Sequence, residues 1–344
     1  THQVDGLEAV RRGENVLVTT PTASGKSLIF HLPVLEEAAR GGPGRALFLY
    51  PLKALGQDQK GKFDDLAAAS GLKEVARCEI YDGDTPRSRR QKIKEDLPRV
   101  LVSNPDMLHL GILSYWQQWE GFLKDLRWVV IDELHTYRGI FGSHFHHVLQ
   151  RLQRICRSVG SDPIFISSSA TAANADEFGH SLTDLEFRWL SESGAPREGR
   201  HFLLVQPESS PYTATLQLFA ALQRAGMKTI VFTKARRITE LLFSWLRRQE
   251  PELATRVASY RSGFLAEERR KIEADLFEGR LDGVISTSAL EMGIDVGGLD
   301  ACILVGYPGS VMATWQRSGR VGRAERESIN ALVAMPDAQD QYFI

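Results

Sequence analysis

The sequence predicts an α/β protein with two tandem domains, each built on a parallel β-sheet flanked by helices. The 344 residues are enough for two domains, and a content of 43% hydrophobic and 25% charged residues is typical of globular proteins. Short apolar runs alternate with amphipathic stretches in both halves, as in strand–helix–strand units. Residues 191–210, rich in glycine, proline, serine and charge, separate the halves as an interdomain crossover. The expected domains are therefore residues 1–195 and 196–344.

The alternation also places the individual elements. In the first half the expected strands are residues 15–19, 46–50, 99–103, 128–131 and 163–167, and the expected helices are 26–40, 55–69 and 142–157. In the second half the expected strands are 229–233, 256–260, 283–286 and 301–305, and the expected helices are 235–248 and 266–278. Continuous apolar runs of strand length are typical of parallel sheets buried on both faces.

Composition limits the kinds of partner that the chain can have. The net charge is −1, so a nucleic-acid partner would need a local groove rather than a general cationic field. No stretch approaches the roughly 18–20 apolar residues of a membrane span, so we expect no membrane association. Cys78, Cys156 and Cys302 are few, far apart and set among apolar residues, which predicts buried reduced thiols in a cytoplasmic protein and no zinc site. The chain begins at Thr1 without a signal peptide, and we expect it to be a piece of a longer protein.

A phosphate-binding loop follows the first expected strand. Residues 20–27 read TPTASGKS and join that strand to a helix, which is the context that a P-loop requires. Lys26 would reach the β- and γ-phosphates of ATP, and the hydroxyl of Ser27 would bind Mg²⁺. Thr20 replaces the first glycine of the usual pattern, so an ordinary strand-to-helix turn with a surface lysine is the alternative. The expected nucleotide contacts in the loop are Thr22, Ala23, Ser24, Gly25, Lys26 and Ser27.

An acidic pair strengthens the prediction of an ATP site. Asp132 and Glu133 begin the sequence DELH at the end of a buried strand. A carboxylate at the tip of such a strand holds Mg²⁺ beside a P-loop, so Asp132 is the expected magnesium partner, through water. Glu133 is the expected general base for the attacking water. A helix N-cap is the alternative for an isolated pair, but Lys26 in the same domain favours hydrolysis.

Two basic residues near the end of the chain extend the site to the second domain. Residues 316–323 read QRSGRVGR, with Arg320 and Arg323 three positions apart. We expect both on one helical face, reaching across a cleft between the domains to the γ-phosphate as arginine fingers. The alternative is a solvated basic end of a helix. Small hydroxyl residues at 168–171 and the stretch STSALEMGIDV at 286–296 complete the pattern.

Taken in order, these elements resemble the motifs of the superfamily 2 helicases over essentially the whole chain. The resemblance implies two RecA-like domains that bind ATP and Mg²⁺, although Thr20 and Ala23 replace glycines of the family's first motif. It places Gln3 at the family's adenine-reading position and has Gln316 contact the nucleotide or His135. It also places Gly293 and Asp295 in a nucleotide-binding motif. Expected phosphate contacts to a nucleic-acid strand, made without sequence reading, are Lys53, Ser103, Asn104, Thr287 and Ser288.

A narrower resemblance concerns residues 132–144, DELHTYRGIFGSH, and the linker SGAPREGRHF at 193–202. Both are similar to the YprA/MrfA group of bacterial DNA-repair helicases and their Hrq relatives. This implies 3′-to-5′ movement on single-stranded DNA, with flanking domains, one of them a cysteine-rich C-terminal domain, that the present chain lacks. We expect a monomer.

Two alternatives remain open at this point. A DExH-type RNA helicase is one, because a groove that grips phosphates does not by itself distinguish the 2′-hydroxyl. An ATP-gated nucleic-acid clamp without turnover is the other. The presence of Lys26, Glu133, Arg320 and Arg323 together argues against the clamp, since a clamp does not need all four.

Overall fold

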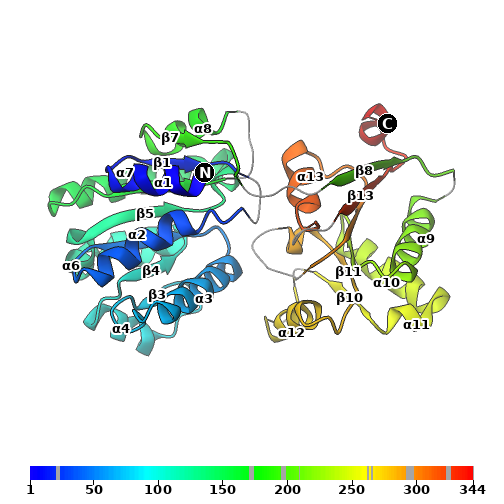
Figure 1. Cartoon of the computed structure of the whole chain (residues 1–344), viewed down its shortest axis with the longest axis horizontal. Coiled ribbons are helices and arrows are strands. Elements are labelled where there is room, and N and C mark those ends of the chain that lie inside the picture. The colour runs from blue at the N-terminus through cyan, green and yellow to red at the C-terminus, as the bar shows by residue number, and fades with distance from the viewer. Residues whose placement is uncertain are drawn as a thin grey trace. The chain divides into compact units, whose positions relative to one another are not determined.

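The computed structural model describes residues 1–20, 24–169, 174–194, 199–208, 210–261, 263–264, 266–291, 298–322 and 327–343. The chain divides into two compact units, Thr1–Ala195 and Pro196–Ile344. Each unit contains one parallel sheet with helices against it (Figure 1). The α/β architecture with parallel sheets, expected from the sequence, is therefore confirmed.

The sheet of the first unit has the strand order β3-β4-β2-β5-β6-β1-β7, and all pairs are parallel. The strands are β1 (Val16–Val18), β2 (Arg45–Leu49), β3 (Cys78–Ile80), β4 (Val100–Ser103), β5 (Leu126–Ile131), β6 (Ile164–Ser168) and β7 (Arg188–Leu190). The helices are α1 (His2–Arg11), α2 (Leu28–Ala39), α3 (Lys53–Ala69), α4 (Arg87–Glu95), α5 (Pro105–Met107), α6 (Glu120–Lys124), α7 (Gly139–Ser158) and α8 (Ala175–Thr183), with the shorter or irregular turns η1 (Leu108–Ile112), η2 (Leu113–Trp119) and η3 (Leu134–Thr136).

The apolar runs form strands because both faces of this sheet are covered. In β2 the side chains alternate, so that Leu47 and Leu49 join one core cluster and Phe48 joins the other. Phe145 and Leu149 of α7 pack in the first cluster, at the i, i+4 spacing of one helix face. Two-sided burial explains why these strands read as continuous hydrophobic segments.

The sheet of the second unit has the order β10-β11-β9-β12-β13-β8, again with parallel pairs. The strands are β8 (Arg200–Val205), β9 (Thr229–Phe232), β10 (Val257–Tyr260), β11 (Gly283–Ser286), β12 (Ala301–Val305) and β13 (Ser328–Val333). The helices are α9 (Pro211–Arg224), α10 (Arg236–Gln249), α11 (Pro251–Ala254), α12 (Ala266–Phe277), α13 (Val311–Ser318) and α14 (Ala338–Phe343), with the turn η4 (Ser288–Leu290).

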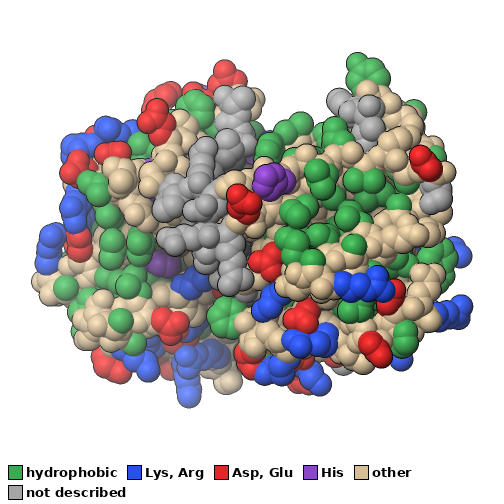
Figure 2. Space-filling model, turned by 45° about the vertical axis from the view of Figure 1, so that its right-hand side comes forward, with side chains coloured by type: hydrophobic (Ala, Val, Ile, Leu, Met, Phe, Trp, Pro, Cys, Tyr) green, Lys and Arg blue, Asp and Glu red, His purple; other side chains and the backbone are tan. Residues whose placement is uncertain are grey.

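The expected crossover at residues 191–210 is wrong in part, because it contains strand β8. This strand lies at the edge of the second sheet and pairs with β13 along its whole length. Its apolar residues Phe202, Leu203 and Leu204 are all exposed. Apolar side chains are visible on the surface of the second unit (Figure 2). An edge strand needs hydrogen bonds on one side only, so it forms here without the two-sided burial that marks the other strands.

Two further expectations from composition can be compared with the structure. Cys78, Cys156 and Cys302 are buried free thiols, and burial raises the pKa of the Cys156 thiol to about 11. Among the described residues, no helix has both the length and the apolar character to cross a membrane.

Candidate nucleotide-binding and hydrolysis site

The carboxyl ends of three neighbouring strands bring the first-unit motifs together. Strand β6 lies between β1 and β5, with Val18 opposite Ser168 and Ile131 opposite Ser167. The loops that follow these strands therefore leave the sheet at one edge. In open parallel sheets, ligands bind at this edge.

The phosphate loop is closed by a pair of hydroxyls. The Oγ1 of Thr20 lies 2.6 Å from the Oγ of Ser24, and both residues are buried. Thr20, which replaces the family's glycine, thus supplies a hydrogen bond that spans the loop. Thr22 and Ala23, two expected nucleotide contacts, lie outside the described residues.

Gly25 has a backbone conformation that other residues rarely adopt. Its φ is +76°, in the left-handed region that favours glycine. A Cβ at this position would also lie 2.3 Å from the Nε2 of Gln3. The side chain of Gln3 donates from this Nε2 to the carbonyl of Gly25, at 3.2 Å. The structure therefore places the expected adenine-reading glutamine against the phosphate loop.

His2 also supports the loop, although it was not among the residues expected from the sequence. The amide of Gly194 donates to its Nδ1 at 3.2 Å, and its Nε2 lies 2.9 Å from the carbonyl oxygen of Ser24. These partners require the neutral tautomer with the proton on Nε2. His2 therefore ties the loop to a distant segment of the first unit. Its position next to Gln3 was the only available signal in the sequence.

Lys26 occupies the centre of the candidate site. Its Nζ donates to the carbonyl of Thr20 at 2.7 Å and to that of Ser169 at 3.4 Å. Burial lowers the pKa of its ammonium, whereas the carboxylates of Glu133 and Asp132 act in the opposite direction. Both acidic residues are therefore close enough to interact electrostatically with this ammonium, as the P-loop prediction requires.

Asp132 is a half-buried carboxylate. Burial and the neighbouring charge of Glu133 raise its pKa to about 6, and the hydrogen bond from the Oγ of Ser168 and the charge of Lys26 oppose the shift. The raised pKa means that the surroundings of Asp132 do not fully stabilise its ionised form. A divalent cation would supply the positive charge that stabilises this form, so the residue fits its expected role as a magnesium partner.

Glu133 has an unusual backbone conformation for a residue with a side chain. Its φ is 51° and its ψ is 45°, in the left-handed region. Its carbonyl accepts hydrogen bonds from the amide and the hydroxyl of Thr136, at 2.9 and 2.8 Å, which hold the turn. A strained backbone of this kind occurs disproportionately at functional sites.

His135 is held next to Glu133 in its neutral form. Its Nδ1 lies 3.6 Å from the Oε2 of Glu133 and 3.3 Å from the Oγ of Ser169. Burial, followed by the charges of Arg138 and Lys26, lowers the pKa of the imidazole to about 4. Because the imidazole is neutral, it does not form an ion pair with the carboxylate of Glu133.

Two buried tyrosines lie near Asp132. The hydroxyls of Tyr50 and Tyr137 have no hydrogen-bond partner within the described parts of the chain. Burial, followed by the charge of Asp132, raises the pKa of both phenols. Their sequence positions carried no signal, because each reads as an ordinary core aromatic.

The second unit departs from the expectation for the arginines. Arg320 was predicted to share a helical face with Arg323, but α13 ends at Ser318, before both residues. The buried Val321 forms a bridge with Leu299, so core packing draws the chain away from the helix. The Nε and Nη2 of Arg320 donate to the carbonyl of Glu291, at 3.1 and 2.6 Å.

Other expected residues of the second unit fall into two groups. Gln316 is buried in α13. Its neighbour Arg317, which was not predicted, makes an ion pair of 2.9 Å with Glu291 and lies over the ring of Phe232. Arg323, Gly293 and Asp295 lie outside the described residues.

The expected nucleic-acid contacts differ in exposure. Lys53 pairs with Asp84 at 2.6 Å on the surface, and Ser288 is exposed. Ser103 and Thr287 are buried, and the hydroxyl of Ser103 donates to the carbonyl of Tyr81 at 2.6 Å. The side chains of Asn104 and Thr287 accept from the amides of Met107 and Ala289, at 2.9 and 3.4 Å.

The first unit thus brings one ammonium and two carboxylates to the end of a phosphate loop. Ser27 is the N-cap of α2, so the first amides of that helix follow it directly. Helix amides, a lysine and an uncompensated acid suit a polyphosphate with a divalent cation. The set Lys26, Ser27, Asp132 and Glu133 can bind such a ligand and activate water.

Family models match both units of the chain. The model described as "DEAD/DEAH box helicase" matches residues 1–178, and the "Helicase conserved C-terminal domain" model matches residues 212–325. The two parallel sheets are therefore those of tandem RecA-like helicase domains.

Curated relatives match the chain along its whole length. It is 41% identical to the uncharacterized ATP-dependent helicase YprA of Bacillus subtilis over 355 residues, covering 100% of this chain and 47% of YprA. It is 37% identical to the ATP-dependent helicase HRQ1 of Saccharomyces cerevisiae over 361 residues, covering 100% of this chain and 33% of HRQ1. The chain thus spans half or less of the length of these relatives.

Solved structures agree with the sequence matches. A crystal structure of the DUF1998 helicase MrfA bound to DNA and AMPPNP superposes with a TM-score of 0.94 at 41% identity, covering 100% of this chain and 49% of that one. The helicase Lhr of Mycobacterium smegmatis, bound to single-stranded DNA and AMP-PNP, has a TM-score of 0.81 at 27% identity, covering 98% and 46%.

Proposed function

The chain belongs to the DEAD/DEAH box helicase family, and on that premise we propose that it is an ATP-dependent DNA helicase or translocase motor. Residues 1–195 would form the ATP-binding domain and residues 196–344 the helicase C-terminal domain. ATP hydrolysis would drive movement along a single strand, in the 3′-to-5′ direction, during DNA repair. The motor would act as a monomer in the cytoplasm.

The observation that carries this proposal is the group around Lys26. The ammonium donates to the carbonyls of Thr20 and Ser169, which follow β1 and β6. Burial lowers its pKa, and the charges of Glu133 and Asp132, which follow β5, oppose this shift. Neither a structural turn nor a surface lysine explains a partly buried ammonium beside two acids. Phosphoryl transfer does explain it, because its catalysis consists mainly of positioning and charge stabilisation.

The proposed chemistry assigns one role to each residue. Lys26 neutralises charge on the β- and γ-phosphates of ATP, and Glu133 accepts the proton of the attacking water. Ser27 and Asp132 would hold Mg²⁺, which supplies further positive charge to the phosphates when it is bound. Neutral His135 leaves the carboxylate of Glu133 available for the proton.

The second unit is proposed to complete hydrolysis. Arg320, together with Arg323, would place guanidinium groups on the γ-phosphate as charge develops there. Bound ATP would then stabilise the conformation in which both units contact it, and release of the products would remove this stabilisation. This coupling would convert turnover into movement along the strand.

The choice of DNA rests on relatives rather than on the residues of the site. MrfA has been crystallised with DNA, and the structure of Lhr contains single-stranded DNA; the two match this chain over 100% and 98% of its length. Phosphate contacts alone do not separate DNA from RNA.

ATP hydrolysis with and without nucleic acid tests the proposal. We expect single-stranded DNA to stimulate turnover more strongly than single-stranded RNA of the same base sequence. Stimulation by RNA alone would replace the DNA assignment with an RNA helicase. No turnover with either polymer, together with retained ATP binding, would replace it with a clamp.

A further inference from the structure

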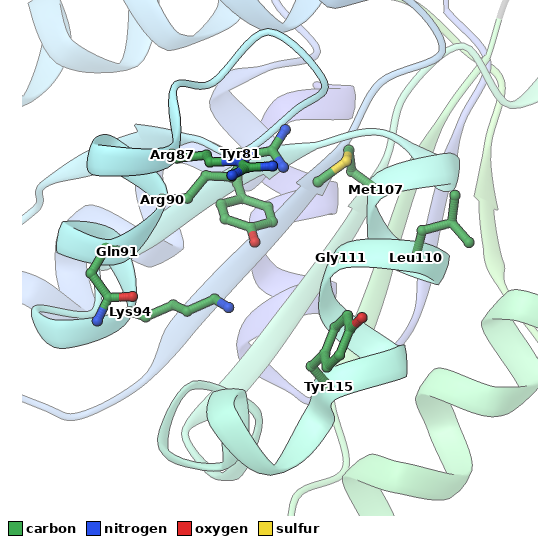
Figure 3. A pocket seen from close by; sticks show the side chains of 9 residues that line it. All are labelled: Tyr81, Arg87, Arg90, Gln91, Lys94, Met107, Leu110, Gly111 and Tyr115. Carbon is green, nitrogen blue, oxygen red and sulfur yellow. The ribbon is translucent and has the colours of Figure 1, made fainter.

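A separate cavity of about 350 Å³ opens on the first unit, between α4 and the segment formed by η1 and η2 (Figure 3). This volume lies within the range of about 300–1,000 Å³ that is typical of small-ligand sites. The proposed ATP site contributes no residue to it. Its lining residues include Tyr81, Arg87, Arg90, Lys94, Met107 and Tyr115.

The charge of the cavity is unlike that of the whole chain. Helix α4 reads RSRRQKIKE, with five cations and one acid, whereas the net charge of the chain is −1. Arg87, Arg90 and Lys94 recur at helical spacing and line the cavity together. Of the lining residues that the structure describes, none is acidic. The cavity is therefore suited to an anion.

One of its cations, Arg90, is incompletely satisfied, whereas Lys94 donates to the Oε1 of Gln118 at 2.7 Å. The guanidinium of Arg90 donates to the carbonyls of Asp82 and Gly83 at 2.8 and 3.3 Å, but its buried Nε has no hydrogen-bond partner among the described residues. Burial and the neighbouring charge of Arg90 lower the pKa of Lys94. A bound anion would relieve both conditions.

Aromatic side chains accompany the cations. Tyr81 lies beneath the guanidinium of Arg90, 5.6 Å from it to the ring centroid. Tyr115 is 55% exposed and is held at a kink in η2, where its φ is −129° and its ψ is 39°. In Figure 3 it borders the side of the cavity away from Arg87 and Arg90. Cations beside an accessible aromatic ring are the usual surface for phosphates and stacked bases.

The cavity adjoins two expected strand contacts. Ser103 donates to the carbonyl of Tyr81 at 2.6 Å, and the side chain of Asn104 accepts from the amide of Met107 at 2.9 Å. Both partners line the cavity. A strand that reaches Ser103 and Asn104 would therefore lie next to this opening.

We propose that this cavity binds a further nucleotide of the single strand, with its phosphate on Arg87, Arg90 and Lys94 and its base stacked on Tyr115. This site rests on the proposed function, since it extends the track of the same strand. It adds a base-stacking contact to a proposed strand-binding surface that otherwise consists of hydroxyls, amides and a lysine.

The test measures binding of the whole chain to a fluorescent single-stranded DNA at several salt concentrations. The variants are Arg87→Gln, Lys94→Gln and Tyr115→Ala, and Lys73→Gln, an exposed lysine of the same unit outside the cavity, is the matched control. Each variant at a cation should reduce the slope of log affinity against log salt by about 1. Tyr115→Ala should weaken binding about tenfold at unchanged slope.

Each other result has a definite meaning. If the wild type binds but all three variants behave like Lys73→Gln, the cavity is not part of the track. If the variants weaken binding of duplex DNA only, the single-strand assignment is wrong. If the wild type binds no single strand, the proposed function fails together with this site.

Discussion

Glu133 combines a proposed catalytic role with a left-handed backbone, at a φ of 51°. This conformation costs a side-chain-bearing residue about 1–3 kcal/mol, so the rest of the turn must hold it in place. The two hydrogen bonds from Thr136 to the carbonyl of Glu133 do so. The sharp turn keeps Glu133 within electrostatic reach of Lys26 immediately after Asp132.

Replacing Glu133 by glutamine tests the general-base role. The amide keeps the size of the side chain but cannot accept the proton of water, so turnover should fall by about 10²- to 10⁴-fold. Binding of a fluorescent ATP analogue should remain within a few-fold of the wild type. Glu177→Gln, at an exposed acid on α8, is the control. Hydrolysis near the wild-type rate by Glu133→Gln would rule out this base.

Asp132→Asn should make the folded protein more stable at alkaline pH. Because burial raises the pKa of Asp132 to about 6 from 3.8, the folded state favours the protonated acid, and ionisation destabilises the fold as the pH rises through that value. At about pH 8 without Mg²⁺, the neutral amide should raise the free energy of unfolding by about 1–3 kcal/mol. The gain in the free energy of unfolding should vanish below about pH 4, where residue 132 is neutral in both the wild type and the variant. Chemical denaturation at several pH values measures it, and a loss of stability at pH 8 would contradict the assignment.

Sequence order was sufficient to predict that Lys26 and Asp132 lie at the same edge of one sheet, because both residues follow strands of that parallel sheet. The partners of those residues could not be predicted. The hydroxyl pair of Thr20 and Ser24 and the buried ring of Tyr50 depend on distances that arise only when the chain is folded.

At the scale of elements, α1 serves as a support for the phosphate loop. Its first two residues, His2 and Gln3, reach the carbonyls of Ser24 and Gly25. The loop therefore has its backbone held from outside as well as by its own hydroxyl pair. This explains how a loop with threonine in place of a glycine keeps a defined shape.

His2→Ala should weaken this support. It removes two hydrogen bonds and leaves the carbonyl of Ser24 and the amide of Gly194 without partners, which should lower the free energy of unfolding by about 1–3 kcal/mol. The KM for ATP should rise several-fold, with a smaller change in kcat. His109→Ala, at an exposed histidine, is the control. An unchanged KM would show that the loop keeps its shape without α1.

Most of the strands that the sequence revealed, such as β2 and β5, have buried side chains along nearly their whole length. Strands β3, β7, β8 and β13 were not predicted. Strands β7 and β8 are edge strands with exposed side chains, so the pattern of two-sided burial is absent there, whereas β13 is largely buried and was overlooked. The end of α13 was misplaced for another reason. Val321 is buried in the core, where it forms a bridge with Leu299. The residues around Ser318 do not reveal this long-range contact, so the spacing of the arginines alone suggested that the helix continues.

At the scale of the whole molecule, the two units carry complementary parts of one proposed reaction. The first holds Lys26 and Glu133, which would bind phosphate and activate water. The second holds Arg320, buried and donating to the carbonyl of Glu291. A motor needs both parts, because ATP hydrolysis can drive movement only if it is coupled to a change in the arrangement of the two domains.

Turnover of ATP by the Arg320→Gln chain, with saturating single-stranded DNA, is the most direct measurement of that dependence. Glutamine can still donate to the carbonyl of Glu291, so the thermal midpoint should stay within a few degrees of the wild type. ATP binding should remain close to normal, while kcat should fall by about 10³-fold or more, as for other arginine fingers. Turnover within a few-fold of the wild type would contradict a hydrolysis reaction shared by the two units.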